Sequence, residues 1–398
     1  MSDSHFLMVS PFGLIRTPKI LFGTGVVDRL PAMMRPQGGK ILIITGSKSF
    51  LQNEGVGNLL ASFEKEKITL YFDRIETEPT AEMIDRITNR FRNVEIQAVV
   101  AVGGGSVMDA GKAVSAMLPL ESTVKDYIEG VGTKSHPGIK KFFAAIPTTS
   151  GTGSEATANA VLTGSGQRLG FKRSLRHENL VPDLAVVDPS LTLGCPAHIT
   201  ATSGMDAFTQ LIESYLSVKS GPMTDILALD GIRQVHHSLI MACRHGENQE
   251  ARSGMAYAAL LSGITLANAG LGLVHGFASS IGGAFDIPHG LICATMMGIV
   301  NRCNVKSLLQ NKTGDETTFK YVSLGKILSE TEGKDDAWYM KFTADYLDEL
   351  TTNLNIGKLG SFGVTRNDLA KIASVTDHKA NPVHFEMEEL EEMLQSRL

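Results

Sequence analysis

Residues Val99 to Lys112, VVAVGGGSVMDAGK, give the clearest indication of the fold of this chain. A continuous apolar run leads into three glycines, and a helical pattern follows at once. Such a run is typical of a strand buried on both faces of a parallel sheet. Glycine lets the backbone approach a ligand, and the start of a helix offers free N–H groups and a positive dipole that suit a phosphate. The stretch is neither a GxGxxG nor a Walker A motif, so it predicts either a nucleotide-binding turn or a tight turn without a ligand.

The same alternation of strand and helix extends on both sides of this stretch. Apolar strands are predicted over 19–25, 40–45, 68–74, 98–102, 142–146 and 184–187, with helices over 53–67, 80–91 and from the glycine turn to Ala116. This spacing predicts a doubly wound, Rossmann-like α/β domain over residues 1–190. Helical periodicity alone follows, over 205–217, 223–243, 249–267, 291–302, 341–354, 365–373 and 386–395. We therefore expect an all-α second domain over residues 191–398.

The composition excludes several classes of protein. The chain of 398 residues has a net charge of −5 and no long basic run, so nothing favours a nucleic-acid partner. We find neither a signal-peptide pattern nor an apolar run of membrane-spanning length. The four cysteines show no CxxC pairing and are typical of reduced thiols. We expect a cytoplasmic protein that acts on small molecules, with no membrane partner.

A second glycine-containing turn runs from Pro147 to Glu155, PTTSGTGSE, and also follows a predicted strand. Its hydroxyl and N–H groups suit a diphosphate and a ribose, although by itself it could equally be a surface loop. The carboxyl ends of parallel strands meet at the edge where open α/β sheets bind nucleotides. We therefore expect the two turns to hold a nucleotide or dinucleotide together.

Two histidines, His275 and His289, interrupt the otherwise apolar, glycine-rich stretch LVHGFASSIGGAFDIPHGL over residues 273–291. A buried imidazole needs hydrogen-bond partners or a ligand. A single histidine in such a setting is more often a satisfied core residue. Two of them in one stretch make a metal or catalytic site as plausible as that reading.

These segments resemble the iron-containing (group III) alcohol dehydrogenase family, which has the dehydroquinate synthase-like fold. The matching segments are FGTG (22–25), GGGSVMDAGK (103–112), PTTSGTGSEAT (147–157), VVDPSLT (186–192), TSGMDAFTQLIESYLS (202–217) and NAGLGLVHGFASSIGGAFDIPHG (268–290). The resemblance implies reversible hydride transfer between NAD(P) and an alcohol/aldehyde pair. It places the nicotinamide between the two domains, beside a divalent metal such as Fe²⁺ or Zn²⁺. Its members are commonly dimers or larger homo-oligomers.

The resemblance also assigns site residues, position by position. It assigns the pyrophosphate-binding turn to Gly103, Gly104, Gly105, Ser106 and Asp109, and the second cofactor loop to Thr148, Thr149 and Ser150. It assigns three metal ligands, which also form the catalytic centre, to Asp206, His275 and His289.

The metal site departs from the family at two positions. The fourth ligand, a histidine four residues after the aspartate, is here Gln210, and a second histidine is replaced by Ser279. Gln210 shares a helix face with Asp206, but an amide oxygen is a weaker ligand than imidazole. Three alternatives stay open: metal held with Gln210 or water completing the set, weak binding or a harder ion, and metal-free reduction as in maleylacetate reductases. That branch lacks the aspartate, so its presence favours a metal. Without a metal, an imidazolium of His275 or His289 would stabilise the oxyanion.

The cofactor specificity depends on the end of the second strand. NAD-using relatives often carry an aspartate there, whereas this chain has Gly46, followed by Ser47 and Lys48. A small residue, a hydroxyl and a cation leave room for a 2′-phosphate and attract it. We therefore predict that NADP is favoured over NAD.

Two further functions compete with the alcohol dehydrogenase reading. One is a dehydroquinate synthase-like lyase or cyclase with tightly held NAD, although the segments SGTGSEAT and GLVHG fit the dehydrogenase branch better. The other is a catalytically inactive binding protein, which the replaced histidines at Gln210 and Ser279 suggest.

Overall fold

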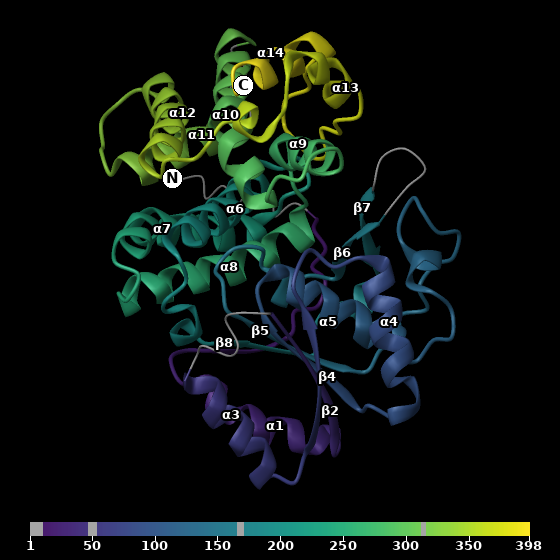
Figure 1. Cartoon of the computed structure of the whole chain (residues 1–398). Coiled ribbons are helices and arrows are strands. Elements are labelled where there is room, and N and C mark those ends of the chain that lie inside the picture. The colour runs from purple at the N-terminus through teal and green to yellow at the C-terminus, as the bar shows by residue number, and fades with distance from the viewer. Residues whose placement is uncertain (1–10, 47–53, 165–170, 312–315) are drawn as a thin grey trace.

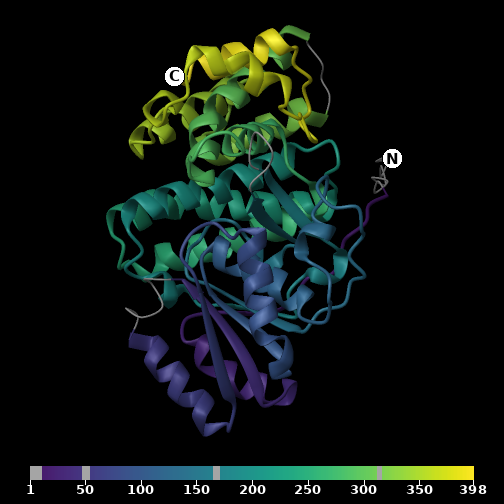
Figure 2. The same ribbon diagram turned by 45° about the vertical axis from the view of Figure 1, so that its right-hand side comes forward.

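The computed structural model describes residues 11–46, 54–164, 171–311 and 316–398. Figures 1 and 2 show a sheet with helices on both sides, followed by a helical region stacked against one end of it. This is the fold class that the sequence predicted. The last strand of the sheet ends at Val187 and the first helix of the helical region begins at Ala197, while the division into domains at residue 190 stays a prediction.

Six strands in the described part of the chain form one parallel sheet with the order β1-β8-β5-β4-β2-β3. They are β1 (Lys19–Phe22), β2 (Lys40–Gly46), β3 (Thr69–Ile75), β4 (Ala98–Gly103), β5 (Phe142–Pro147) and β8 (Leu184–Val187). All six lie where the apolar runs predicted them. Because β3 and β4 flank β2 on opposite sides, the winding direction changes between β2 and β4, and this is where such sheets bind nucleotides.

The central strands β2, β4, β5 and β8 are buried on both faces, which explains their continuous apolar runs. Helices α1 (Leu30–Met34) and α3 (Glu54–Lys65) cover one face, where Ile41 and Ile43 pack. Helices α4 (Ala81–Phe91) and α5 (Gly105–Met117) cover the other, where Leu42 and Ile44 pack. Figure 1 shows the two helix pairs on opposite sides of β2 and β4.

An antiparallel hairpin, β6 (Asn159–Gly164) and β7 (Phe171–Arg176), lies outside the main sheet and was not predicted. It contacts α5. Neither strand has the continuous apolar run that identified the others, because NAVLTG mixes apolar with small and polar residues and FKRSLR carries three basic side chains. The pairing depends on contacts with α5 that the local sequence does not reveal.

Beyond β8 the described residues contain helices and no strand, as the sequence predicted. They are α6 (Ala197–Leu216), α7 (Pro222–Arg244), α8 (Gln249–Ala269), α9 (Leu273–Gly282), α10 (His289–Asn311), α11 (Glu316–Ser329), α12 (Asp336–Asn353), α13 (Leu369–Ser374) and α14 (Met387–Gln395). Helices α9 and α11 were not predicted, and α6 begins at Ala197 rather than at Met205. The glycines of α9 concealed its helical pattern.

The apolar helix α8 continues into α9 after a bend of 97°. Together the two helices have the length and apolarity of a membrane span, but within the described residues no single helix does.

The helical region packs directly on the sheet. Ala185 and Val187 of β8 share a buried cluster with Leu260 of α8. Nearby, the loop after β5 touches α8 backbone to backbone, because a Cβ added to Gly153 would lie 2.4 Å from the nitrogen of Gly263. Only glycine allows this approach, and Gly153 also has a φ of 61°.

Candidate functional site

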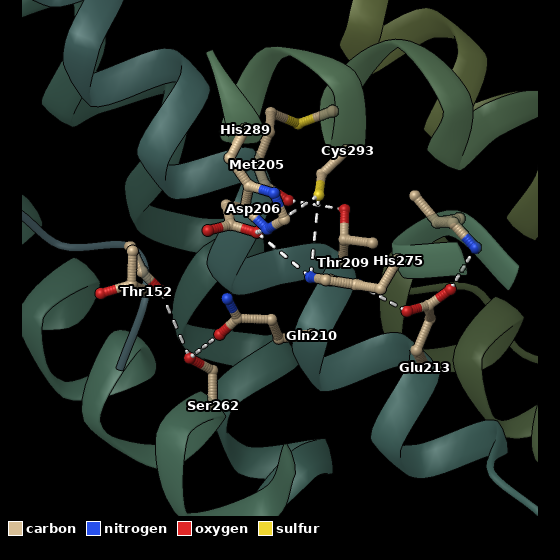
Figure 3. A network of polar contacts seen from close by, with 12 residues as sticks. Thr152, Met205, Asp206, Thr209, Gln210, Glu213, Ser262, His275, His289 and Cys293 are labelled. Atoms are coloured by element: carbon tan, nitrogen blue, oxygen red, sulfur yellow. Dashed lines mark hydrogen bonds and ion pairs between the residues drawn. The ribbon is translucent and has the colours of Figure 1, made fainter. Parts of the chain in front are cut away.

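Three helices bring four potential metal ligands to one point (Figure 3). Asp206 comes from the middle of α6, His275 from the first turn of α9, and His289 is the first residue of α10. Cys293 follows His289 by one turn of α10, so the two side chains share a helix face. The resemblance named the first three, whereas sequence reasoning missed Cys293 although its i+4 spacing from His289 was visible.

The donor atoms of these four residues all lie within 4.8 Å of one another. Asp206 Oδ1 is 3.4 Å from His275 Nε2 and 3.8 Å from His289 Nε2. Cys293 Sγ is 3.7 Å from each of those two nitrogens. At usual zinc bond lengths, ligand atoms of a tetrahedral site are about 3.3–3.6 Å apart. The donors are therefore spaced nearly as a divalent metal would hold them.

The carboxylate of Asp206 is buried and only partly satisfied. Its Oδ1 has no hydrogen-bond partner within the described part of the chain, a state that costs free energy unless a cation or other ligand compensates. Burial alone would raise the pKa of Asp206, but the neighbouring His289 and His275 outweigh burial and hold it below its ordinary value. The residue therefore offers an ionised oxygen to a cation.

A second carboxylate, that of Glu213, contacts the ring nitrogen of His275 that faces away from the cluster. Glu213 Oε2 lies 2.6 Å from His275 Nδ1, and Oε1 accepts a 2.6 Å hydrogen bond from the Val274 N–H. With a proton held on Nδ1, Nε2 faces the cluster and can bind either a second proton or a cation, as in carboxylate–histidine–metal arrangements. Burial lowers the pKa of His275, but Cys293, Glu213 and Asp206 together raise it well above its ordinary value. The surroundings thus stabilise a positive charge at this point.

Burial shifts the pKa values of the other two donors towards their uncharged forms. It lowers the pKa of His289 to about 4. Burial raises the pKa of the Cys293 thiol to about 12. His289 is the most exposed of the four, with 32% of its side chain accessible, so the cluster opens to solvent on this side.

Gln210, the residue expected in the fourth ligand position, lies beside the cluster and is buried. Its Oε1 accepts a 2.7 Å hydrogen bond from Ser262 Oγ of α8, and its amide nitrogen lies on the side of the cluster (Figure 3). Ser262 Oγ is also 3.5 Å from the carbonyl oxygen of Gly151. These contacts connect the loop after β5 to the cluster, while a ligand role for Gln210 stays a prediction.

Ser279, which replaces the second family histidine, does not join the cluster. Its hydroxyl donates a 2.8 Å hydrogen bond to the backbone carbonyl of His275 on the same helix. The side chain is therefore satisfied within α9.

The two glycine-containing turns lie side by side at the ends of the neighbouring strands β4 and β5. The Thr148 N–H donates to the Gly103 carbonyl at 3.0 Å. The two turns also pack closely through their glycines. A Cβ added to Gly104 would lie 3.3 Å from Thr149 Oγ1, and a Cβ added to Gly105 would lie 2.5 Å from the Thr152 side chain. Ser106 is the second residue of α5, and Ser150 lies in the second turn. Both side chains are half-buried. The arrangement offers a helix N-terminus and hydroxyls to an anion.

The third segment that the sequence predicts to bind the cofactor begins where β2 ends, at Gly46, beside β4. Ser47 and Lys48 lie outside the described residues. Gly46 lies where the winding direction changes. In such folds, residues at this position contact the adenosine ribose of the dinucleotide.

Two charged residues of α5, Asp109 and Lys112, form hydrogen bonds that connect this helix to the second turn and to the hairpin. Asp109 accepts hydrogen bonds from Ser154 Oγ at 2.5 Å and from the Val161 N–H at 3.0 Å, and burial raises its pKa above the ordinary value. The fully buried Lys112 donates to the carbonyl oxygens of Ser154 at 2.9 Å and Asn159 at 2.8 Å. Sequence reasoning missed this role of Lys112. Both oxygens of Asp109 bond within the protein, and its assignment to the cofactor turn stays a prediction.

A parallel sheet with two glycine-containing turns, followed by helices that gather an Asp–His–His–Cys cluster, describes a nucleotide-binding α/β enzyme with a candidate metal centre. Residues 17–189 match the family model of iron-containing alcohol dehydrogenase, and residues 200–398 match that of the C-terminal part of the Fe-containing alcohol dehydrogenase family. The chain belongs to the iron-containing alcohol dehydrogenase family and is an oxidoreductase.

Individual relatives agree with this assignment. The chain is 28% identical to alcohol dehydrogenase 4 of Saccharomyces cerevisiae over 96% of this chain and 97% of the relative. It is 34% identical to 1,3-propanediol dehydrogenase of Citrobacter freundii over 71% of this chain and 73% of the relative. The crystal structure of a 1,3-propanediol oxidoreductase superposes with a TM-score of 0.87 at 27% identity, covering 98% of this chain and all of that one.

These similarities confirm the family and the fold class that the sequence predicted. They favour neither a dehydroquinate synthase-like lyase or cyclase nor a maleylacetate reductase-like metal-free reductase.

Proposed function

We propose that the chain catalyses reversible hydride transfer between a nicotinamide dinucleotide and a small alcohol/aldehyde pair, at a site that holds a divalent metal, Fe²⁺ or Zn²⁺. The observation that carries the proposal is the buried Asp206 oxygen, which has no hydrogen-bond partner among the residues that the structure describes and is set among two imidazole nitrogens and a thiol. The names of the relatives, which include alcohol and propanediol dehydrogenases, support the substrate class.

Each part of the chain contributes a separate task to this reaction. A divalent metal, when bound, supplies a Lewis acid that favours the deprotonated alcohol and polarises an aldehyde carbonyl. Asp206, His275 and His289 would hold it, and Glu213 fixes the proton of His275 on Nδ1. The N-terminus of α5, where Gly104 leaves the backbone without a Cβ, accepts the pyrophosphate. The buried surroundings of His275 exclude water on that side, so the substrate approaches past the half-exposed His289.

We also propose that NADP is the favoured dinucleotide. The support is the absence of a carboxylate at Gly46, which ends β2 at the change of winding direction. An aspartate there would repel a 2′-phosphate, whereas glycine leaves room for it.

A cytoplasmic location and a homo-oligomeric state, such as a dimer, are further parts of the proposal. Four cysteines without a disulfide suit a reducing compartment. Light scattering of the purified chain measures the oligomeric state directly.

The experiment that tests the proposed function combines metal analysis with an activity assay. We expect the purified chain to contain about one divalent metal per chain, and NADPH oxidation with a panel of small aldehydes to require it. Cofactor binding without aldehyde-dependent oxidation under any metal supplement would instead identify an inactive binding protein.

A further inference from the structure

We propose that Cys293 is a ligand of the metal centre, so that the chain holds its metal through Asp206, His275, His289 and Cys293. This inference rests on the proposed function, because it names a ligand of the metal which that function uses. It gives Cys293 the fourth position, which the family resemblance alone assigned to Gln210.

The first argument is geometric. Cys293 Sγ lies 3.7 Å from His275 Nε2 and 3.7 Å from His289 Nε2. With a metal–sulfur bond of about 2.3 Å and metal–nitrogen bonds of about 2.0–2.1 Å, a tetrahedral site separates sulfur and nitrogen by about 3.5–3.6 Å. Shifts of a few tenths of an ångström bring all the measured separations to these values. No change of helix position is needed, because His289 and Cys293 lie one turn apart on α10.

The second argument concerns what surrounds the thiol. Cys293 is fully buried, and a buried free cysteine normally packs as a small apolar residue. Cys293 does pack in such an apolar cluster, but its sulfur also faces two imidazole nitrogens and lies in one group with Asp206, whose Oδ1 has no hydrogen-bond partner in the described ranges. A metal cation satisfies that oxygen, both imidazoles and the sulfur at once.

The third argument concerns the competing residue. The oxygen of Gln210 accepts the 2.7 Å hydrogen bond from Ser262, and its amide nitrogen lies on the cluster side (Figure 3). An amide nitrogen carries protons and offers no lone pair to a metal. Binding through Gln210 would require the amide to turn over, whereas Cys293 already faces the other donors.

The ligand set determines the kind of metal. A bound metal would displace the proton of the Cys293 thiol to solvent, and the resulting thiolate is a soft ligand that suits Zn²⁺, whereas carboxylate and imidazole alone suit Fe²⁺ as well. Two anionic ligands, the carboxylate and the thiolate, also balance the charge of a divalent ion. The site therefore takes Zn²⁺ more selectively than a site in which Cys293 is replaced.

The test uses the full-length chain, stripped of metal with a chelator and reloaded with Co²⁺ or Zn²⁺. Co²⁺ bound to a thiolate gives a sulfur-to-cobalt charge-transfer band in the near ultraviolet, which nitrogen and oxygen ligands do not give. We expect this band in the wild type and its loss in Cys293→Ser. X-ray absorption of the Zn²⁺ form should show a sulfur shell at about 2.3 Å.

Matched variants separate the possible outcomes. Cys303→Ser removes a half-buried thiol from the same helix and should keep the band, as should Gln210→Ala. The ratio of Zn²⁺ to Fe²⁺ affinity should fall by at least about tenfold in Cys293→Ser only. Two results would overturn the assignment of Cys293 while leaving the metal centre itself in place. One is bound metal that shows no sulfur shell. The other is loss of metal in Gln210→Ala together with a charge-transfer band that Cys293→Ser leaves unchanged. A wild-type chain that binds neither ion overturns the metal centre of the proposed function itself. The absorption measurement needs no variant, so it decides even if Cys293→Ser does not fold.

Discussion

His275 Nδ1 and Glu213 Oε2 lie 2.6 Å apart in the buried interior of the helical region. Glu213 follows Asp206 by two turns of α6, so one helix supplies both a candidate metal ligand and the carboxylate that orients another. The second carboxylate oxygen accepts the Val274 N–H at the start of α9. Glu213 therefore fixes both the position of α9 and the direction of the imidazole.

The substitution Glu213→Gln should weaken metal binding by about 10–100-fold, because a neutral amide stabilises the oriented imidazole less than a carboxylate does. Competition with a chelator of known Zn²⁺ affinity measures the change. An exposed residue of α8, Glu250, supplies the control Glu250→Gln. Unchanged metal affinity in Glu213→Gln would show that His275 is not a ligand, or that its orientation does not depend on Glu213.

Neighbouring glycines of the first turn should respond differently to alanine. In Gly104→Ala the new Cβ lies 3.3 Å from Thr149 Oγ1, so the Thr149 side chain has to shift by a few tenths of an ångström, and the free energy of unfolding should change by no more than about 1 kcal/mol. Its methyl group occupies the space proposed for the pyrophosphate, so the dissociation constant for NADPH should rise at least about tenfold. Gly105→Ala places a Cβ 2.5 Å from Thr152 and should destabilise the fold by about 1–3 kcal/mol.

Fluorescence titration with NADPH and thermal unfolding measure the two effects of these glycine variants. If Gly104→Ala binds NADPH as the wild type does, the turn is a structural turn without a ligand.

The dinucleotide preference should reverse when a carboxylate is placed at the end of β2. Gly46→Asp should raise the KM for NADP⁺ by at least about tenfold, because the carboxylate repels a 2′-phosphate, and should lower or leave unchanged the KM for NAD⁺. Gly46→Asn has the same shape without the charge and serves as the control. A wild type that already prefers NAD⁺ would contradict the proposed preference.

The stability of the chain should depend on pH through Glu155, a buried residue of the loop after β5. Burial raises its pKa from 4.5 to about 7. The native state therefore favours the protonated form, and this contribution is fully present below pH 4.5 and is lost as the pH rises through about 7. Glu155→Gln removes this charge. Its effect on the free energy of unfolding should therefore be more favourable above pH 7 than at pH 4.5, by up to about 3 kcal/mol.

Thermal unfolding of Glu155→Gln and the wild type, measured across this pH range, tests that prediction. The difference between the two melting temperatures should grow with pH and then level off. Glu121→Gln, at an exposed position, should show no such trend. A constant difference would mean that Glu155 is ionised throughout.

The sequence predicted the sheet well because its central strands β2, β4, β5 and β8 are buried on both faces. Ile41 to Ile44 pack alternately on the two sides, so the whole run has to be apolar and stands out locally. The hairpin β6–β7 escaped prediction because its stability comes from α5 and from Asp109, far away in the sequence. Helix α9 escaped because its glycines, such as Gly276 against the backbone of Asp377, are required by close packing that no local pattern reveals.

From the sequence, we could predict only those site residues that match the pattern of the family. Asp206, His275 and His289 match the family pattern, and the structure brings them together. Cys293 was treated as an ordinary thiol, because its proximity to His275 depends on how α9 and α10 pack. The hydrogen bond between Gln210 and Ser262 likewise depends on the approach of α8 and could not be derived from α6 alone.

The contact between Gly153 and Gly263 links the two regions of the chain to the candidate site. Two backbones touch there without any side chain between them, so a side chain added at either glycine would push the loop after β5 and α8 apart. The neighbouring Ser262 contacts the Gly151 carbonyl oxygen and donates to Gln210. A change at either glycine, neither of which is a candidate ligand, would therefore reach the Gln210 side of the cluster.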